Sequence, residues 1–500
     1  MSIRTYVRLG GVMTLALFVA IVPAAAQDEH QHEAPAAGAQ EAGHDMAAMA
    51  REGSGTAWLP DASPMYAVHR QRGPWTLMAH ENLFVQFLHD SGDRGSDQVG
   101  SINWVMGMAQ REAGRGHLGL RGMFSVEPWT IRGCGYPDLL ASGEECRGAT
   151  IHDRQHPHDL PMEIAVEYDA PAYGDVRWQV YGGPAGEPAL GPVAYPHRVS
   201  AMANPLAPIA HHWLDSTHIS FGVVTGGLYG KRWKLETSAF NGREPDEHRK
   251  NFDFGALDSV SGRVSVLPTA NLALQVSGGR LKEAEAGENG GPRTDVSRVT
   301  ASATYHRVRP KSIWASTFGW GRNAESGHAT SAMLVETTVT IADRDTWFGR
   351  FETVGKTAHD LDVTSTADAF TVAKLQGGYT RYLEGAHGFK PGLGVTASLG
   401  VVPAGLRAVY GGRVNPGAGV FLTLRPAAMV MATNAGGGRT MVMVQTAFDP
   451  ATLTCPAGFD PKSAASTMYE GKTYYFCSVE DRDTFLTNPA MSLSMMPPKQ

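Results

Sequence analysis

A regular alternation of apolar and polar residues recurs along the chain beyond Trp58 and constrains its fold more than any other feature. In residues 298–306 the alternate positions are Val, Ala, Ala and Tyr, and the positions between them are polar. Because successive side chains of a β-strand point to opposite faces, such a segment has one apolar and one polar face. The same pattern recurs in residues 218–223, 272–277 and 333–341. The chain is therefore predicted to be all-β.

The connections between these segments alternate in length. About sixteen segments are expected between residues 75 and 425. Short turns are predicted at residues 114–116, 230–231, 268–270, 309–311 and 343–345, and long links at 127–161, 186–216 and 241–257. Bacterial outer-membrane barrels have short periplasmic turns and longer outside loops, whereas a soluble sandwich has no reason for this regularity. We expect an antiparallel transmembrane β-barrel of about 16 strands over residues 58–428.

The N-terminus predicts export. Residues 1–26 combine Arg4 and Arg8 with an apolar core and a small-residue Ala24-Ala25-Ala26 cleavage site, the pattern of a signal peptide. No later stretch has the roughly 20 apolar residues of a membrane-spanning helix, so membrane insertion would use strands. An even strand number places both chain ends in the periplasm. The predicted location is the outer membrane, with its lipid as a partner.

Composition excludes some classes of function. The net charge is -6, and no basic stripe suggests nucleic-acid binding. No nucleophile motif or phosphate loop is present, so no catalytic residue is predicted and the protein is not expected to be an enzyme. Aromatic residues near segment ends are expected to form interfacial girdles. They are Trp75, Trp104, Trp178, Trp233, Trp314, Trp347, Tyr379 and Tyr382.

A specific motif lies near the C-terminus. Cys455-Pro456 is followed by the run Tyr-x-Gly-Lys-x-Tyr-Tyr-Phe-Cys-Ser at residues 469–478, and then by Phe485 and Pro489. This pattern resembles the YHS domain, a small module associated with heavy-metal handling. The resemblance covers about the last tenth of the chain and defines a module at residues 449–500, after a linker at 429–448.

The resemblance implies a metal site with fewer cysteines than usual. Family members often carry further cysteines, whereas only Cys455 and Cys477 occur here. A closed thiolate site of the zinc type requires four protein ligands. Two sulfurs suit Cu(I) instead, with help from the methionines between residues 491 and 496. The alternative is a Cys455–Cys477 disulfide in an oxidising compartment.

Two other segments contain candidate metal or disulfide residues. Cys134 and Cys146 flank a short polar segment, and in an exported protein we expect them to form a disulfide. Residues 27–57 are poor in large apolar residues and are predicted to be a disordered leader. The leader contains His30, His32, His44, Met46 and Met49, which either bind copper weakly or simply occur in an Ala-rich spacer.

Two long links contain the remaining candidate ligands. His152, His156 and His158 lie within one link, with Asp153 and Asp159 available to orient their rings. The next long link adds further histidines, namely His211, His212 and His218. If both links fold into the lumen, the six imidazoles converge at a constriction. The alternative is that they form polar cross-links and hydrogen bonds with loop backbone.

The barrel interior is expected to carry charges of both signs, as a polar lumen does. Its predicted members are Glu163, Glu167, Lys234, Glu236, Glu336, Arg350, Glu352 and Lys374.

These features favour an outer-membrane barrel with a periplasmic YHS-like module that takes part in heavy-metal binding or transport. Copper is the leading metal and zinc the second candidate, and periplasmic metal-handling proteins are the expected protein partners. One alternative is a non-conducting structural barrel with a protein-docking module. Another is a secreted metal-dependent enzyme that uses His152, His156 and His158.

Overall fold

The computed structural model describes residues 51–285, 292–309, 311–325, 327–365, 367, 369–429, 465–469, 472–476 and 479–487. None of the helices among these residues is long and apolar enough to span a membrane. Cys455 and Cys477, the signal peptide and most of the predicted leader lie outside the described residues.

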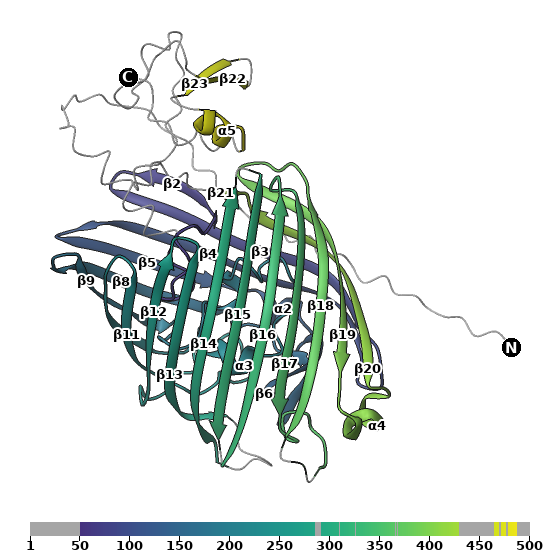
Figure 1. The fold of residues 1–500 in the computed structure, drawn as a ribbon. Coiled ribbons are helices and arrows are strands. Elements are labelled where there is room, and N and C mark those ends of the chain that lie inside the picture. The colour runs from purple at the N-terminus through teal and green to yellow at the C-terminus, as the bar shows by residue number, and fades with distance from the viewer. Residues whose placement is uncertain are drawn as a thin grey trace. The chain divides into compact units, whose positions relative to one another are not determined.

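The described strands form a closed antiparallel barrel (Figure 1). The ring consists of β3 (Trp75–Asp90), β4 (Asp97–Ala113), β5 (Gly116–Phe124), β8 (Pro161–Tyr173), β9 (Val176–Ala185), β10 (Val223–Tyr229), β11 (Trp233–Phe240), β12 (Ser259–Thr269), β13 (Leu272–Glu285), β14 (Thr294–Arg309), β15 (Ser312–Glu325), β16 (His328–Ile341), β17 (Asp345–Lys356), β18 (Phe370–Tyr382), β19 (Phe389–Val401) and β20 (Val414–Pro426). The first and last of these strands pair from Leu83↔Leu424 to Asp90↔Gly417 and close the ring. The predicted count of about 16 strands is confirmed.

One additional strand extends the wall. β2 (Val68–Arg72) pairs with the part of β3 that β20 does not reach, from Val68↔Ala79 to Arg72↔Trp75. Beside it, β1 (Met65–Tyr66) pairs with β21 (Ala428–Met429). The two ends of the barrel segment therefore meet at one rim.

The strands have an apolar outer face and a polar inner face. In β12, Val260 and Val264 are exposed on the outside, while Ser261, Arg263 and Ser265 are buried towards the lumen. Such an outer wall is what a barrel surrounded by lipid requires. The predicted mixed-charge interior is also confirmed, because the side chains of Lys234, Glu236, Glu336, Arg350, Glu352 and Lys374 are almost completely buried and those of Glu163 and Glu167 lie on the same inner face.

Connection lengths alternate as predicted. Only two residues separate β4 from β5 and three separate β10 from β11, whereas residues 125–160 connect β5 to β8 and residues 186–222 connect β9 to β10. The short turns lie at one rim and the long links start from the other. We call these the short-turn rim and the long-loop rim.

Two expected girdle residues instead face inward. Trp104 and Tyr382 are 7% and 1% exposed, whereas Trp178, Trp233, Trp314 and Trp347 are exposed on the outer wall. Both faces of β4 are apolar near Trp104, where Val105 points outward and Met106 inward. Alternation in the sequence therefore could not tell the two faces of this strand apart.

The predicted boundary between leader and barrel at residue 57 differs from the structure. Residues 51–57 lie in the lumen, where Lys234 Nζ donates to the Thr56 carbonyl at 2.7 Å and Arg121 Nη2 pairs with Glu52 at 2.8 Å. Lumenal charges thus hold a segment whose composition alone suggests disorder.

The described part of the C-terminal module contains a small hairpin and a helix. β22 (Ala465–Tyr469) and β23 (Lys472–Phe476) pair antiparallel, and α5 (Val479–Thr487) follows. Phe485 packs against Tyr474 and Phe476, with ring centroids 5.0 and 5.2 Å apart. Three residues of the YHS-like motif therefore form an aromatic core.

The apolar outer wall leads to a stability prediction. Val264→Arg places a charge on the outer face midway along β12, and we expect a loss of about 2–4 kcal/mol, as for a lipid-facing charge near a bilayer midplane. Equilibrium urea unfolding in lipid vesicles measures the change. Arg70→Lys on the exposed part of β2 is the control, and equal stability of both variants would contradict a lipid-facing wall.

Candidate functional site

Two long links fill the lumen. The first contains α2 (Glu127–Thr130) and a hairpin of β6 (Tyr136–Cys146) and β7 (Ala149–Gln155), and the second contains α3 (His211–Leu214). The expected Cys134–Cys146 disulfide is present and joins the two ends of the segment that contains β6.

Wall charges hold both links in place. Lys374 of β18 donates to Asp138 Oδ1 at 2.5 Å, Arg198 donates to Glu336 Oε1 at 2.7 Å, and the Ala210 amide donates to Glu352 Oε1 at 3.0 Å. Partners on the links thus neutralise charges that the wall presents to the lumen.

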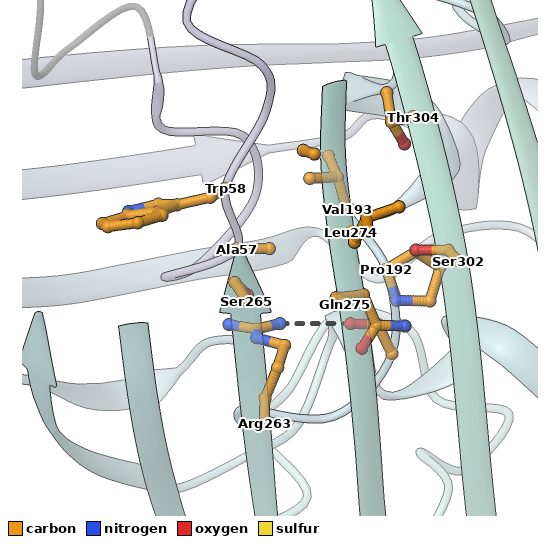
Figure 2. Close-up of a pocket in the computed structure, with 12 residues that line it drawn as sticks. Ala57, Trp58, Pro192, Val193, Arg263, Ser265, Leu274, Gln275, Ser302 and Thr304 are labelled. Atoms are coloured by element: carbon orange, nitrogen blue, oxygen red, sulfur yellow. Dashed lines mark hydrogen bonds between the residues drawn. The ribbon is translucent and has the colours of Figure 1, made fainter. Parts of the chain in front are cut away.

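Little space remains between the links and the wall in one part of the lumen. Figure 2 shows Ala57 and Trp58 of the N-terminal segment and Pro192 and Val193 of the second link against Arg263 and Gln275 of the wall. The cavity between them is about 10 Å³, which is roughly the space of one water molecule. Segments of this chain therefore occupy the lumen here.

Three histidines from the two links meet in the lumen. His156 follows β7, and His211 and His212 begin α3. All three are buried, and one ring nitrogen of each lies within 4.8 Å of those of the other two. Ligand nitrogens lie about 2 Å from a bound zinc ion, so small side-chain movements would complete the site. We call these three residues the histidine site.

The Nδ1 atom of each histidine in the site has an oxygen partner. His211 Nδ1 lies 2.8 Å from Asp215 Oδ1, His212 Nδ1 lies 2.8 Å from Glu244 Oε1, and His156 Nδ1 lies 3.2 Å from the Pro157 carbonyl. Metal-binding histidines commonly donate one ring N–H to such an oxygen, which orients the other nitrogen towards the ion.

Two nitrogens of the site have no partner. His156 Nε2 and His212 Nε2 are buried without a hydrogen-bond partner in the described part of the chain. Buried polar atoms are normally satisfied, and these two belong to a larger set of buried side-chain atoms without a partner among the described residues. Two of the three histidines therefore have a ring nitrogen free to bind a metal ion.

Burial favours the neutral form of these imidazoles, which is the form that binds metal ions. It lowers the pKa of His156 well below its usual value, and the Arg249 guanidinium lowers this pKa further. Burial also lowers the pKa of His211 and of His212, although nearby carboxylates act in the opposite direction. Metals bind neutral imidazole, so the site needs no deprotonation near neutral pH.

His158 and His218 lie beside the histidine site. Glu127 and Tyr195 occupy both ring nitrogens of His158, at 2.9 and 3.0 Å. Burial lowers the pKa of His158, but the Glu127 carboxylate outweighs burial and raises it overall. The ring centroids of His218 and His211 are 5.1 Å apart. Five of the six predicted histidines thus come together, and His158 has a structural role.

His152 does not join them. Its Nδ1 lies 2.9 Å from Asp153 Oδ2 and 3.1 Å from Arg94 Nη1, and its side chain is 31% exposed. The predicted convergence of six histidines is therefore wrong for this residue. The three histidines of the first link do not form one set of ligands.

Three carboxylates that were not predicted from the sequence lie around the histidine site. Glu244 and Glu285 form a second possible group of ligands with His212. Glu144 Oε2 lies 3.3 Å from His156 Nδ1. No sequence signal identifies these residues, because they come from different links and strands.

An acidic cavity lies next to the histidine site. It has a volume of about 270 Å³, and five carboxylates in its lining outnumber two guanidinium groups, those of Arg147 and Arg293. The carboxylates are those of Glu144, Glu145, Glu244, Asp246 and Glu247. Glu144 and Glu244 both line this cavity and contact histidines of the site. A cation in the cavity would therefore be within reach of the imidazoles after passing two carboxylates.

Comparisons with known proteins give weak similarities. No protein-family model matches the chain, and no curated protein matches it. Among solved structures, the chain is similar to the outer-membrane protein OmpT of Vibrio cholerae, with 10% identity and a TM-score of 0.42 over 72% of this chain and 100% of that one.

Two further solved structures have comparable scores. The anion-selective porin of Comamonas acidovorans has 9% identity and a TM-score of 0.42 over 71% of this chain and 100% of that one. Salmonella typhi OmpF has 9% identity and a TM-score of 0.45 over the same shares. The assignment of this chain as a closed β-barrel with an apolar outer wall rests on its own strand pairing.

A half-buried histidine of the second link yields a pH prediction. The ring of His197 packs on Trp104, with centroids 4.7 Å apart. Burial, with help from Arg121 and His158, lowers the pKa of His197 to about 4. An unfolded histidine titrates near pH 6.5, so between pH 6.5 and 4 the unfolded chain binds a proton that the folded chain does not. Stability should therefore fall as pH falls through this window.

Protonation of His197 in the unfolded chain should lower the free energy of unfolding by about 3 kcal/mol at pH 4. His197→Phe keeps an aromatic ring against Trp104 and removes the titration, so its stability should decline less between pH 6.5 and 4. Urea unfolding at several pH values measures the difference, with the exposed His248→Phe as the control. Parallel pH profiles for His197→Phe and the unsubstituted protein would contradict the prediction.

Proposed function

We propose that the protein is an outer-membrane β-barrel that handles transition-metal ions and holds one at the histidine site. The observation that carries this proposal is the meeting of His156, His211 and His212, with two buried Nε2 atoms that have no partner. Copper is the leading ion and zinc the second, because both accept imidazole ligands. The acidic cavity would supply the cation from the long-loop rim.

The location follows from the wall. Its apolar outer face suits a bilayer, and in bacterial barrels the short turns face the periplasm. Both ends of the barrel segment lie at the short-turn rim, which supports a periplasmic leader and C-terminal module. The module resembles the YHS domain, and we propose that it exchanges metal with periplasmic metal-handling proteins through Cys455 and Cys477.

Metal binding is tested directly on the purified full chain. Cu(II) and Zn(II) should each bind at the histidine site, and His156→Ala and His211→Ala should weaken binding by at least the 10–100-fold typical of lost supporting groups. Glu244→Gln should weaken it by 10–100-fold because Glu244 orients His212. Isothermal titration measures the affinities.

The matched control is His387→Gln, an exposed histidine that does not line the acidic cavity. It should bind metal as the unsubstituted protein does, and the leader histidines contribute equally to every variant. Each variant is first checked for the mobility shift on heating in detergent that folded barrels show. Affinities of folded His156→Ala and His211→Ala equal to that of the control would refute the proposal.

A structural, non-conducting barrel is the second candidate, because both links occupy the lumen. Metal binding and a closed lumen are compatible, and planar-bilayer recording separates a binding barrel from an open pore. We expect no steady current from the unsubstituted protein. Lys374→Met removes the cation that holds Asp138 and should produce brief openings, whereas a large steady current before substitution would contradict a closed lumen.

A further inference from the structure

A second group of metal-ligand residues lies on the inner wall towards the short-turn rim. Seven buried methionines pack in one cluster there, together with Trp104 and other apolar residues. They are Met65, Met78, Met106, Met108, Met123, Met162 and Met429. The inner face of such a barrel is usually polar, so this concentration of thioethers is unexpected.

Strand register arranges several of these methionines beside histidines. His69 of β2 is opposite Met78 of β3, which is opposite Met108 of β4. Residues directly opposite in antiparallel strands have Cβ atoms about 4.5–5.5 Å apart on the same face. These three side chains therefore form a row across the inner wall.

A second row lies next to the first. His80 of β3 is opposite Met106 of β4, which is opposite Met123 of β5. His80 and Met78 are two residues apart on one strand and thus share its inner face. Together the two rows offer four thioethers and two imidazoles. We call these six residues the Met/His rows.

His69 provides an independent indication of a ligand. Both of its ring nitrogens are buried and make no hydrogen bond of standard geometry among the described residues, and the Ala67 backbone is the polar group that acts on the ring. Leaving such a group unsatisfied costs about 1–3 kcal/mol. A metal ion that binds one of these nitrogens would remove part of that cost.

The donor set selects a class of ion. Thioether sulfur is a soft ligand that favours Cu(I), whereas carboxylate, carbonyl and water ligands favour Mg²⁺ and Ca²⁺. The Met/His rows contain neutral donors and no carboxylate. A monovalent ion requires less charge compensation from its ligands than a divalent one.

We propose that the Met/His rows bind a soft monovalent cation, Cu(I) or its close analogue Ag(I). This site goes beyond the proposed function, because it uses different residues from the histidine site and different donor atoms. Trp104 lies two residues before Met106 on the same inward face of β4 and packs on His197 of the second link, the link that also carries His211 and His212. An ion released towards the short-turn rim would meet sulfur ligands there.

Substitution by leucine separates binding from packing. Methionine also fills irregular spaces in cores, and a change to leucine keeps the volume while removing the sulfur. The test uses the full chain in detergent with Cys455→Ser and Cys477→Ser, so that thiols do not compete. Ag(I) is titrated calorimetrically, and Cu(I) is titrated in competition with a chromogenic chelator.

Met78→Leu/Met108→Leu and Met106→Leu/Met123→Leu should each lower the Ag(I) affinity by about tenfold or more. Met333→Leu is the matched control, because Met333 lies on the exposed outer wall. His156→Ala/His211→Ala should leave Ag(I) binding at the rows unchanged, so the two sites are tested separately. Affinities of both double leucine variants equal to that of the control would overturn the proposal.

A spectroscopic measurement tests the proposal without the leucine substitutions in the Met/His rows, so it remains possible if a leucine variant does not fold. X-ray absorption of the Ag(I)-loaded, cysteine-free protein should show at least two sulfur neighbours. The same signal should persist when Met46 and Met49 of the leader and Met491, Met495 and Met496 of the C-terminal module are changed to leucine. Only nitrogen or oxygen neighbours around silver in that protein would overturn the proposal.

Discussion

The lumen of this barrel depends on charge pairs between its wall and the two long links. Glu336 accepts from Arg198 of the second link and from Arg350 of the wall, at 2.7 and 3.0 Å. Removing one partner of a buried ion pair is strongly destabilising, typically by about 3–5 kcal/mol, because the other charge stays buried and uncompensated. Wall and links therefore hold each other in place, and the positions of the lumenal histidines follow from these pairs.

The donor atoms of the lumen change from one rim to the other. Carboxylates such as Glu144 and Glu244 line the cavity near the long links, imidazoles come together below it, and thioethers lie beside β2 near the short-turn rim. Oxygen, nitrogen and sulfur donors suit progressively softer cations. A mixed-charge lumen alone would not produce this order of donor atoms.

Much of the fold was predictable from the sequence, because strand alternation and turn residues are local properties. The start of β3 at Trp75, the end of β20 within one residue of 425, the short turns and the Cys134–Cys146 disulfide agree with the expectation. Trp104 and residues 51–57 were predicted wrongly. In β4 both faces are apolar, and in residues 51–57 charges on distant strands, rather than local composition, determine the position of the segment.

The candidate site was predictable only in part. Histidine density pointed to both links, but only their folding shows that His156 meets His211 while His152 turns to Arg94 and Asp153. The roles of Glu244 and of the Met/His rows had no sequence signal, because opposite residues in neighbouring strands can be far apart in the chain.

The sequence by itself determined a barrel of about 16 strands, the two long links and the kinds of ligand available. Only the tertiary structure decided which ligands share a site and which nitrogens remain without a partner. The physical reason is that alternation depends on neighbouring residues, whereas a metal site depends on barrel closure and on buried charge pairs between distant segments.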